Sequence, residues 1–535
     1  MREYSEEEKK ILAQYCTNLD KPIYGLINLP EVVAGALFSR YSRSSKSARE
    51  VLLEEFIQNI DMEFSKIAAS IDSNKQIVAT QKAEEFYNRV LVGYGDDSVA
   101  ELGGAHMAIE EISNIATKFI EDSRIGLSPL EKSTRYVYFD QKDNDGNYRY
   151  YKGKEILNTK VGQEYIKTSN YLFEVYSKLL KEVYQKLLEK YPQGQDISKR
   201  AYENTIKAKT CDLLRGLLPA STLTNMGIFA NGRAYEYLLT KMYASNLPEI
   251  NFIAEEMYQE LMKIIPSFVK RVKSPHGLES IEYIKNTKQG IREYMEKNFT
   301  GNEDLQKEEV ELVYYDKEAE DKIIWAILFE NGFSYKDAQK KAIELSEEKK
   351  IQILKEYVGK RKNRRHKPYR AFELPYYTFS ICANFGQYRD IQRHRILTQV
   401  RQLLDCKKGY DIPKEIVEFG FKKEFEDALS VAKECHQKME EELNKELAQY
   451  IVPMAYRLNW YINLNLREAF HLIELRSSIQ GHADYRRLVI KMFEKIKQVH
   501  PRLAEGMIFV NEKEVELERL EAEKKVDKKL KSFMH

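Results

Sequence analysis

The stretch Tyr388-Arg-Asp-Ile-Gln-Arg-His-Arg-Ile-Leu-Thr-Gln-Val-Arg-Gln-Leu-Leu404 combines a dense group of cations with regularly spaced apolar residues. Its apolar residues recur close to helical spacing, at Ile391, Leu397, Val400, Leu403 and Leu404. This spacing predicts a helix with one buried face and another face that carries the cations. Upstream, the aromatic and β-branched run 374–381 predicts a strand, and the run 384–386 predicts the turn that joins strand to helix.

The cations of this stretch suit a polyanionic ligand, because guanidinium groups match phosphate oxygens with two parallel hydrogen bonds. A basic run on a helix is, however, more often a solvated face without a ligand. The rest of the chain has to decide between these two interpretations.

Composition describes a soluble globular protein. The chain has 535 residues, of which 43% are hydrophobic and 31% charged, with a formal net charge of +2. This near-neutral balance argues against a general nucleic-acid binder. No apolar run reaches the roughly 20 residues that span a bilayer, and the polar N-terminus does not fit a signal peptide. The five cysteines form no CxxC pair, so we expect a cytoplasmic protein with no disulfide framework and no metal site.

Most of the chain reads as helix. We expect helical segments within 1–75, 83–92, from about 99 to 120, 160–190, 245–270, 318–359, 414–450 and 484–500. A strand is expected at 310–315. Polar or Gly-rich composition predicts loops at 93–98, 140–153, 271–307 and 359–367. The charged run from Glu512 onward predicts a solvated helix or a frayed tail.

An internal repeat divides the chain. Pro219 precedes Arg233 by fourteen residues, within Asn231-Gly-Arg233, and Pro453 precedes Arg467 by the same distance, within Asn465-Leu-Arg467. Glu101 stands before Arg124 much as Glu373 stands before Arg395. Two diverged copies are therefore expected, with boundaries at 1–300 and 301–535.

These residues give the chain a resemblance to the flavin-dependent thymidylate synthases, whose signature is Arg-His-Arg followed by Glu-x-Ser-x-Arg. The C-terminal copy has Arg393-His394-Arg395, but Leu403 stands at the serine position. The N-terminal copy has Asp122-Ser123-Arg124 in place of Arg-His-Arg, yet continues with Glu131-Lys-Ser133-Thr-Arg135. The catalytic arginine of the family matches Arg476, and its counterpart in the N-terminal copy is Met242. Each copy thus keeps what the other has lost.

The resemblance implies an α+β, helix-rich fold of two tandem copies, each with a small antiparallel sheet flanked by long helices. Members of the family form tetramers whose sites are shared between subunits. A duplicated chain would then hold one composite site made by both copies, and we expect a homodimer of tandem chains that mimics the tetramer.

The resemblance further implies reductive methylation of dUMP to dTMP with FAD, with NADPH as reductant and methylenetetrahydrofolate as carbon donor. Arg476 would be catalytic and would favour the uracil anion. The implied dUMP contacts are Glu131, Ser133, Thr134, Arg135, Arg393, Arg457 and Arg476. The implied FAD contacts are Ser98, Glu131, Asn231, Arg233, Arg393, His394, Arg395, Asn465, Arg467 and His471.

Departures from the family pattern leave alternatives open. Asp390 stands where the family usually has glutamine, and its charge would oppose a nucleotide unless Arg389 pairs with it. A non-catalytic homologue that binds flavin or a nucleotide is the main alternative. A nucleic-acid binder that uses 360–367 and 389–401 is a second. Without the resemblance, Arg457, Arg467 and Arg476 would pass as surface arginines, with Arg476 paired to Glu474 or Glu468.

Overall fold

A computed structural model describes residues 2–42, 44–57, 99–299 and 309–533. The chain forms two compact units. The first comprises 1–111, 119–131 and 225–301, and the second comprises 112–118, 132–224 and 302–535. The units do not coincide with the expected copies, because 132–224 belongs with the C-terminal part of the chain. The boundaries of the copies, at 1–300 and 301–535, stay a prediction.

The first unit is built around a small sheet. Its helices are α1 (Glu6–Leu12), α2 (Glu31–Tyr41), α3 (Ala48–Val51), η1 (Leu52–Ile57), η2 (Val99–Glu101), α10 (Gly232–Tyr243), α11 (Pro248–Ile264), α12 (Pro266–Val269), η4 (Lys270–Lys273) and α13 (Pro275–Asn298). Its strands are β1 (Gly104–Ser113), β2 (Leu127–Glu131) and β3 (Leu223–Asn231). The unit boundary crosses β1, β3 and α6 (Asn114–Glu121).

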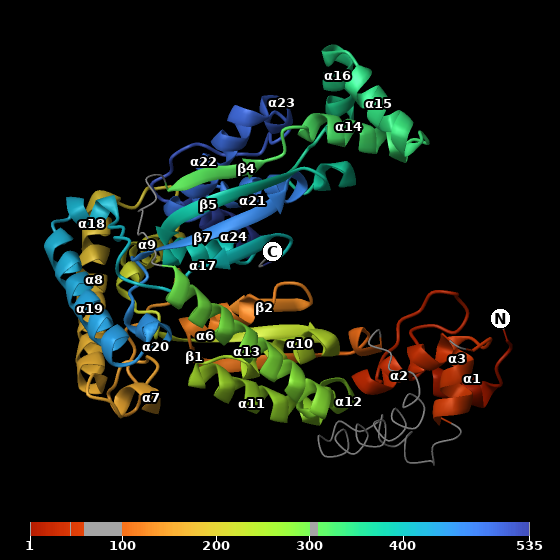
Figure 1. The fold of residues 1–535 in the computed structure, drawn as a ribbon, viewed down its shortest axis with the longest axis horizontal. Coiled ribbons are helices and arrows are strands. Elements are labelled where there is room, and N and C mark those ends of the chain that lie inside the picture. The colour runs from red at the N-terminus through yellow and green to blue at the C-terminus, as the bar shows by residue number, and fades with distance from the viewer. Residues whose placement is uncertain (1, 43, 58–98, 300–308, 534–535) are drawn as a thin grey trace. The chain divides into compact units, whose positions relative to one another are not determined.

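The second unit holds the larger sheet, of β4 (Val310–Tyr315), β5 (Tyr376–Asn384), β6 (Thr398–Arg401) and β7 (Arg457–Asn465). Helices α21 (Leu466–Arg476) and α22 (Ala483–Val499) pack against it, and α8 (Gly162–Lys190) lies beside α19 (Lys422–Glu442) (Figure 1). Its remaining helices are α7 (Lys154–Leu157), α9 (Lys199–Leu214), η3 (Arg215–Leu217), α14 (Ala319–Glu330), α15 (Tyr335–Glu344), α16 (Glu347–Val358), η5 (Arg370–Glu373), α17 (Phe385–Ile391), α18 (Lys414–Glu418), α20 (Lys445–Ala448), η6 (Gln449–Ile451), α23 (Pro501–Ala504) and α24 (Leu520–Phe533).

The two sheets share one strand order, which confirms the expected fold class. The first sheet runs β1-β3-β2, and the second runs β4-β5-β7-β6. Chain order makes β5, β7 and β6 the counterparts of β1, β3 and β2, so β4 is an addition at the edge of the second sheet. The described pairings in both sheets are antiparallel. Along β5, inward residues such as Tyr377, Phe379 and Ile381 are buried, as period-two alternation requires.

The segments around Pro219 and Pro453 pair with local twofold symmetry, and the two prolines face each other in an isolated antiparallel bridge. The amide of Ala220 donates to the carbonyl of Val452, at 2.9 Å, and the amide of Met454 donates to Leu218, at 3.0 Å. The next pair out is equally reciprocal: Ser221 donates to Tyr450, and Ala455 donates to Gly216, both at 2.9 Å. Each of these hydrogen bonds has an equivalent bond in the opposite direction between the copies. The sequence repeat at Pro219 and Pro453 is therefore also a structural repeat.

The helix starts repeat as well. The side-chain oxygen of Asn231 accepts from the amide of Ala234 at 2.9 Å, and that of Asn465 accepts from Glu468 at 2.8 Å. These asparagines cap α10 and α21, because asparagine satisfies an amide that has no partner in the first helical turn. The repeated Asn-x-Arg pattern therefore has a structural cause in both copies.

Several sequence predictions were wrong. The helix predicted over Tyr388–Leu404 ends at Ile391, and 398–401 form β6, which pairs with β7 from Thr398↔Asn463 to Arg401↔Trp460. Ladder bonds to β7 outweigh the helical spacing, and Val400 and Leu403 are exposed. The segment 104–113 is strand rather than helix. The predicted linker within 271–307 contains α13, whose Ser274 caps the helix ahead of Pro275 at its first position.

Other predictions are confirmed. They include the strand at 310–315, the helices within 160–190, 245–270, 318–359 and 484–500, and the irregular segment 140–153. The predicted helix at 83–92 and turn at 93–98 lie outside the described residues. Among the helices that the structure describes, none is long and apolar enough to cross a bilayer.

The Asn465 cap gives a testable prediction. Asn465→Ala should lower the free energy of unfolding by about 1 kcal/mol, because the amide of Glu468 loses its acceptor. Asn465→Ser should retain most of the stability. Urea unfolding followed by far-UV circular dichroism measures both. Equal loss in the two variants would mean that Asn465 does not act as a cap.

Candidate functional site

The segment 133–135 of the N-terminal copy contacts the C-terminal copy inside the second unit. Arg389 Nη1 donates to Thr134 Oγ1 at 3.3 Å, and Arg135 Nη1 donates to the hydroxyl of Tyr485, also at 3.3 Å. Arg476 lies over the same tyrosine ring, 5.7 Å from its centroid, while Arg135 lies at 5.8 Å. Tyr485 therefore joins the arginine of the Glu-x-Ser-x-Arg segment to the predicted catalytic arginine.

Two buried ion pairs surround this tyrosine. Arg135 holds Asp212 with two hydrogen bonds, Nε to Oδ1 at 2.8 Å and Nη2 to Oδ2 at 2.7 Å. Arg215 pairs with Asp390 at 3.0 Å. The charge of Asp390, which would oppose a nucleotide unless it is paired, is thus balanced by Arg215 of the other copy.

The carboxylates of these pairs stay ionised. Burial alone would raise the pKa of Asp390, but Arg215, Arg135 and Arg476 outweigh it and hold that pKa well below its ordinary value. The pKa of Asp212 is likewise lowered, by Arg135 against burial. Two of the three guanidiniums here are therefore neutralised by carboxylates of the chain itself.

Arg476 differs from the other two. Its Nε donates to Nε2 of His394 at 3.0 Å, and no carboxylate of the described residues lies within ion-pair distance of it. The pairings suggested for it are taken: Glu474 binds Arg361, and Glu468 binds His394 and His471. Burial lowers the pKa of Arg476, although the nearby charge of Asp390 opposes this shift.

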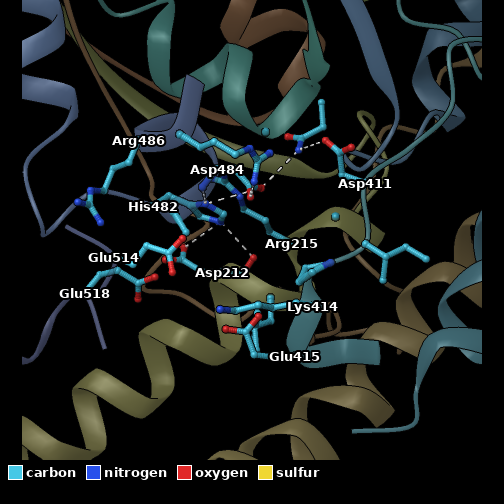
Figure 2. A pocket seen from close by; sticks show the side chains of 18 of the residues that line it. Asp212, Arg215, Asp411, Lys414, Glu415, His482, Asp484, Arg486, Glu514 and Glu518 are labelled. Carbon is cyan, nitrogen blue, oxygen red and sulfur yellow. Dashed lines mark hydrogen bonds and ion pairs between the residues drawn. The ribbon is translucent and has the colours of Figure 1, made fainter. Parts of the chain in front are cut away.

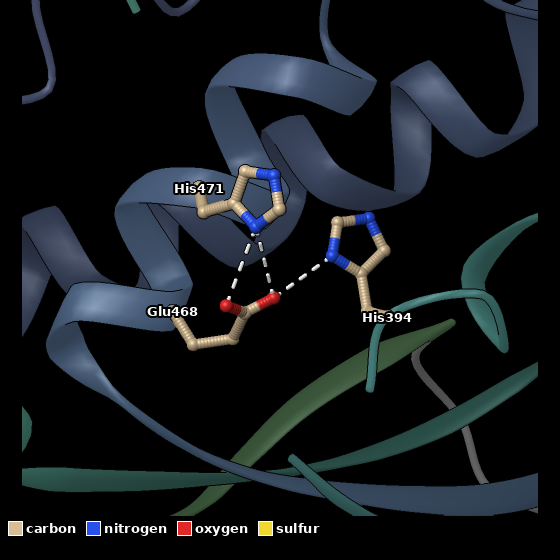
Figure 3. Close-up of side chains that lie close together, drawn as sticks. All are labelled: His394, Glu468 and His471. Atoms are coloured by element: carbon tan, nitrogen blue, oxygen red, sulfur yellow. Dashed lines mark hydrogen bonds and ion pairs between the residues drawn. The ribbon is translucent and has the colours of Figure 1, made fainter. Parts of the chain in front are cut away.

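His394 of the Arg-His-Arg sequence is buried, whereas Arg393 and Arg395 on either side are exposed. Its Nδ1 lies 2.9 Å from Glu468 Oε1, and Nδ1 of His471 lies 3.3 Å from both oxygens of that carboxylate (Figure 3). Burial lowers the pKa of His394 to about 4, although the bond to Glu468 opposes this shift. Hydrogen bonds from both histidines lower the pKa of Glu468 to about 2 against the effect of burial. At neutral pH the carboxylate is charged and His394 is neutral.

These three residues also bring three possible metal-ligand atoms within 4.8 Å of one another. An arginine Nε–H can only donate, so Nε2 of His394 must be the acceptor and Nδ1 must carry the proton. In this arrangement His394 Nδ1 has no lone pair for a metal. The expectation that the chain has no metal site stays a prediction.

A cavity of about 940 Å³ opens in the second unit beside this cluster (Figure 2). Its lining is densely charged, and some of the charges pair within the wall: Arg457 binds Asp411 at 2.8 Å, and Lys209 binds Glu415 at 2.9 Å. Arg457, a predicted phosphate contact, thus lies in this wall and pairs with Asp411.

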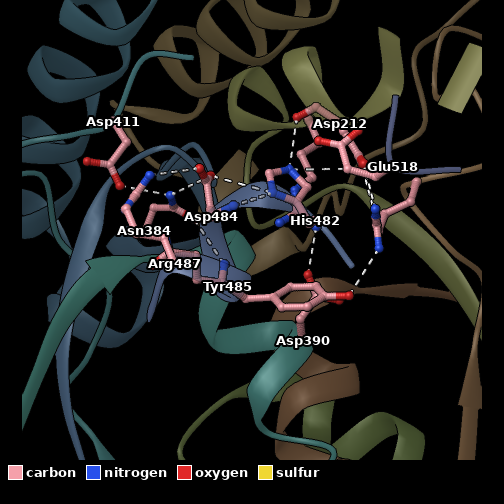
Figure 4. A network of polar contacts seen from close by, with 12 residues as sticks. Asp212, Asn384, Asp390, Asp411, His482, Asp484, Tyr485, Arg487 and Glu518 are labelled. Carbon is pink, nitrogen blue, oxygen red and sulfur yellow. Dashed lines mark hydrogen bonds and ion pairs between the residues drawn. The ribbon is translucent and has the colours of Figure 1, made fainter. Parts of the chain in front are cut away.

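His482 connects the cavity wall to the cluster (Figure 4). The amide of Asp484 donates to its Nδ1 at 3.1 Å, so its proton is on Nε2, which lies 3.3 Å from the carbonyl oxygen of Asp212. Burial and Arg215 lower its pKa. A neutral His482 therefore fixes Asp212, and through it Arg135.

The other predicted site residues are placed as follows. Ser133 accepts from the amide of Arg135 at 3.2 Å. Arg467 binds the carbonyl of Pro368 and the carboxylate of Glu373. In the first unit, Glu131 is buried at the end of β2, and Arg233 pairs with Glu101 on the surface. Ser98 lies outside the described residues.

Sequence reasoning missed four members of the cluster: Asp212, Arg215, His482 as a support, and Tyr485. The repeat itself could have pointed to Arg215. This arginine lies four residues before Pro219, and the equivalent position in the other copy, four residues before Pro453, is the uncharged Gln449. Tyr485 and Asp212 carry no comparable signal, because neither belongs to a repeated or spaced motif.

The chain is similar to proteins of one family. A family described as thymidylate synthase complementing protein matches residues 45–267 and 311–502. A UPF0159 protein of Chlamydia muridarum is 41% identical over 524 residues, which cover 97% of this chain and 98% of that protein. A flavin-dependent thymidylate synthase of Saccharolobus solfataricus is 27% identical over 153 residues, 26% of this chain and 56% of that protein.

Among solved structures, a UMP/dUMP methylase from Streptomyces cacaoi covers 37% of this chain and 93% of its own, with 16% identity and a TM-score of 0.30. The family match falls on both copies, which agrees with the structural repeat.

The neutral His394 predicts a pH dependence of stability. Its folded pKa, about 4, lies below the ordinary value of 6.5, so between these values the unfolded chain binds a proton that the folded chain does not. Wild-type stability should fall as pH drops from 6.5 to 4, and His394→Gln should flatten this slope by up to about 1.4 kcal/mol per pH unit.

Urea unfolding between pH 4 and 7.5 measures the slope. His276→Gln is the matched control, because the His276 side chain is 95% exposed. If wild type, control and His394→Gln share one slope, His394 titrates as an ordinary histidine.

Proposed function

The chain belongs to the family of thymidylate synthase complementing proteins, and we propose that it methylates dUMP to dTMP in one composite site built by both copies. Family membership supports the reaction class. The contacts of Thr134 and Arg135 with Arg389 and Tyr485 support the composite site. The reaction would use FAD, NADPH and methylenetetrahydrofolate, as the family resemblance implies.

One observation carries the proposal: Arg476 is a partly buried cation whose described contacts are a neutral imidazole and a tyrosine. Such a group stabilises an anion that comes within reach. A uracil that loses its N3 proton is an anion of this kind, and its C5 becomes nucleophilic without an attacking thiol. Each unit by which Arg476 lowered the uracil pKa would correspond to about 1.4 kcal/mol.

The cysteines agree with a route that needs no thiolate. Burial raises the pKa of Cys211, Cys406 and Cys435, and also that of the half-buried Cys382. The fifth, Cys16, is buried, and its pKa is raised as well. Thiols with raised pKa values are poor nucleophiles at neutral pH.

The phosphate of dUMP would meet Ser133 and the backbone amides of its turn. Arg135 can assist, because a guanidinium has five N–H donors and the bonds to Asp212 and Tyr485 use three of them. We retain Arg393 and Arg457 as proposed contacts. Of these, Arg457 would have to share its guanidinium with Asp411.

The residues present fit a flavin in part. Arg393 and Arg395 are exposed cations suited to its diphosphate, and His471 keeps its Nε2 available. His394 does not fit as a direct contact, since both of its nitrogens have partners inside the chain. When bound, the flavin would supply hydride transfer.

The overall balance is simple. The methylene group of the folate forms a bond to C5 of the uracil, the C5 proton is lost, and a hydride derived from NADPH completes the methyl group. The products are dTMP, tetrahydrofolate and NADP⁺. The chain would bind the substrate, orient it and stabilise its anion.

A second candidate is a non-catalytic homologue that binds flavin or a nucleotide. Asp390 favours it, because this ionised carboxylate lies within the predicted nucleotide site. The two candidates differ in whether the C5 hydrogen of dUMP exchanges.

Tritium release from dUMP labelled at C5 tests the proposal. Arg476→Ala should reduce release by at least about 100-fold, the loss expected when one electrostatic contact to a developing anion is removed. Ser133→Ala should raise the KM for dUMP, because it removes a phosphate contact. Ser128→Ala makes the same chemical change in an exposed serine nearby and should leave release unchanged.

Flavin absorbance read in the same samples separates the candidates. A yellow protein whose spectrum responds to dUMP, but which releases no tritium with any donor, would establish the non-catalytic homologue. Full release in both Arg476→Ala and Ser133→Ala would rule out the composite site.

A further inference from the structure

Helix α21 carries three polar residues that converge on one side chain of another element. Glu468, His471 and Arg476 lie on α21, and His394 follows α17. His394 is bonded on both ring nitrogens, to Glu468 on one side and to Arg476 on the other. A continuous chain of hydrogen bonds therefore runs from the carboxylate, through the imidazole, to the guanidinium. Figure 3 shows its first part, between Glu468 and His394.

The donors and acceptors of this chain have one consistent assignment. Arg476 Nε–H donates to His394 Nε2 at 3.0 Å, which leaves the imidazole proton on Nδ1. That proton points at Glu468 Oε1, 2.9 Å away. With the opposite tautomer, two N–H groups would face each other at Nε2, and a lone pair would face the carboxylate at Nδ1.

The carboxylate is itself held in place. The amide of Glu468 is capped by Asn465, and its two oxygens are approached by Nδ1 of His471 at 3.3 Å. The side chain of Glu468 is 7% exposed and that of His394 is 2% exposed. Both side chains are thus almost fully buried, and the bond between them fixes the orientation of the ring.

We propose that Glu468 is a positioning residue, whose carboxylate fixes the Nδ1–H tautomer of His394 so that Nε2 holds the guanidinium of Arg476 against Tyr485. Neither the sequence motifs nor the family match single out Glu468. In this assignment His394 supports Arg476 from inside the protein. This support of Arg476 takes the place of the direct flavin contact that the resemblance implied for His394.

The other copy shows that these residues belong together. By the strand registers and helix starts that the copies share, the positions equivalent to His394, Glu468 and Arg476 are Arg124, Ala234 and Met242. The N-terminal copy thus has none of the three groups at its equivalent position. Such joint absence is expected if the three groups serve one purpose, because a buried carboxylate or imidazole without its partner is destabilising.

The proton on His394 can be observed directly. We would label the nine histidines of the full chain with ¹⁵N and assign His394 by its loss in His394→Gln. Wild type should show a far-downfield, slowly exchanging proton on Nδ1 and a non-protonated Nε2. Glu468→Gln keeps an acceptor oxygen and should shift this proton upfield. Glu468→Ala should lose it.

The kinetic arm rests on the proposed function. Glu468→Ala should lower the kcat of tritium release about 10- to 100-fold, the range seen when a supporting partner of a functional histidine is removed. The KM for dUMP should change little, and Glu468→Gln should recover part of the rate. This split is expected because Arg476 acts on the anion that forms during the reaction.

Glu474→Gln is the matched control. Glu474 lies on the same helix, is buried, and binds Arg361 at 2.7 Å. Its loss should reduce stability in urea, yet leave the Nδ1 proton and kcat unchanged. A merely structural role of Glu468 would make the two variants alike.

The outcomes are distinct. A proton on Nε2 of His394 in wild type would overturn the proposal, and this measurement does not depend on the folding of any variant. An Nδ1 proton that persists unchanged in a folded Glu468→Ala would overturn it as well. The expected tautomer in a wild type that releases no tritium would uphold the hydrogen-bond assignment and refute the proposed reaction.

Discussion

The reciprocal hydrogen bonds around Pro219 and Pro453 are the constraint on which the candidate site depends. Proline supplies no amide, so the bonds fall to the residues on either side, and each bond in one direction is matched by one in the other. This short ladder joins the end of η3 and the residues up to Ser221 in one copy to residues 450–455 of the other, between η6 and β7. Arg215 lies next to Gly216, at one end of that ladder. From there it pairs with Asp390 of the other copy.

Charge compensation is the second constraint. Arg135, Arg215 and Arg476 would repel one another if all three were buried without anions. Asp212 and Asp390 neutralise two of them, each with a carboxylate from within the same unit. A buried pair of this kind adds little net stability, but either partner left alone is costly. Among the described residues, Arg476 has no carboxylate at ion-pair distance, and its Nε bonds to the neutral imidazole of His394 instead.

The sequence predicted the duplication, because it rests on spacing that folding preserves. The composite site stays a prediction, although Thr134 and Arg135 of one copy contact Arg389 and Tyr485 of the other. The sequence could not predict β6, because the cations and the apolar spacing of 389–401 are typical of a helix. The strand forms only because it pairs with β7, which is distant in sequence. The sequence could not predict α13 either, where a Ser-Pro start follows a run that reads as a linker. The ion pairs of Asp212 and Asp390 join residues 77 and 175 positions apart, and no local pattern reports such contacts. The motif implied that His394 contacts the flavin, whereas in the structure the side chain is buried and accepts a hydrogen bond from Arg476.

The covalent link between the copies has a consequence for how such a site depends on concentration. Where separate subunits share a site, dilution separates the subunits and the site is lost. Each subunit must then carry all of the residues that the site needs. In this chain the segment 133–135 and Tyr485 are tethered, so their encounter is intramolecular and its effective concentration does not fall on dilution. Selection can then act on each half separately, and a residue lost from one half is tolerated as long as its equivalent in the other is kept. Duplication followed by complementary loss gives a protein whose two halves are no longer interchangeable.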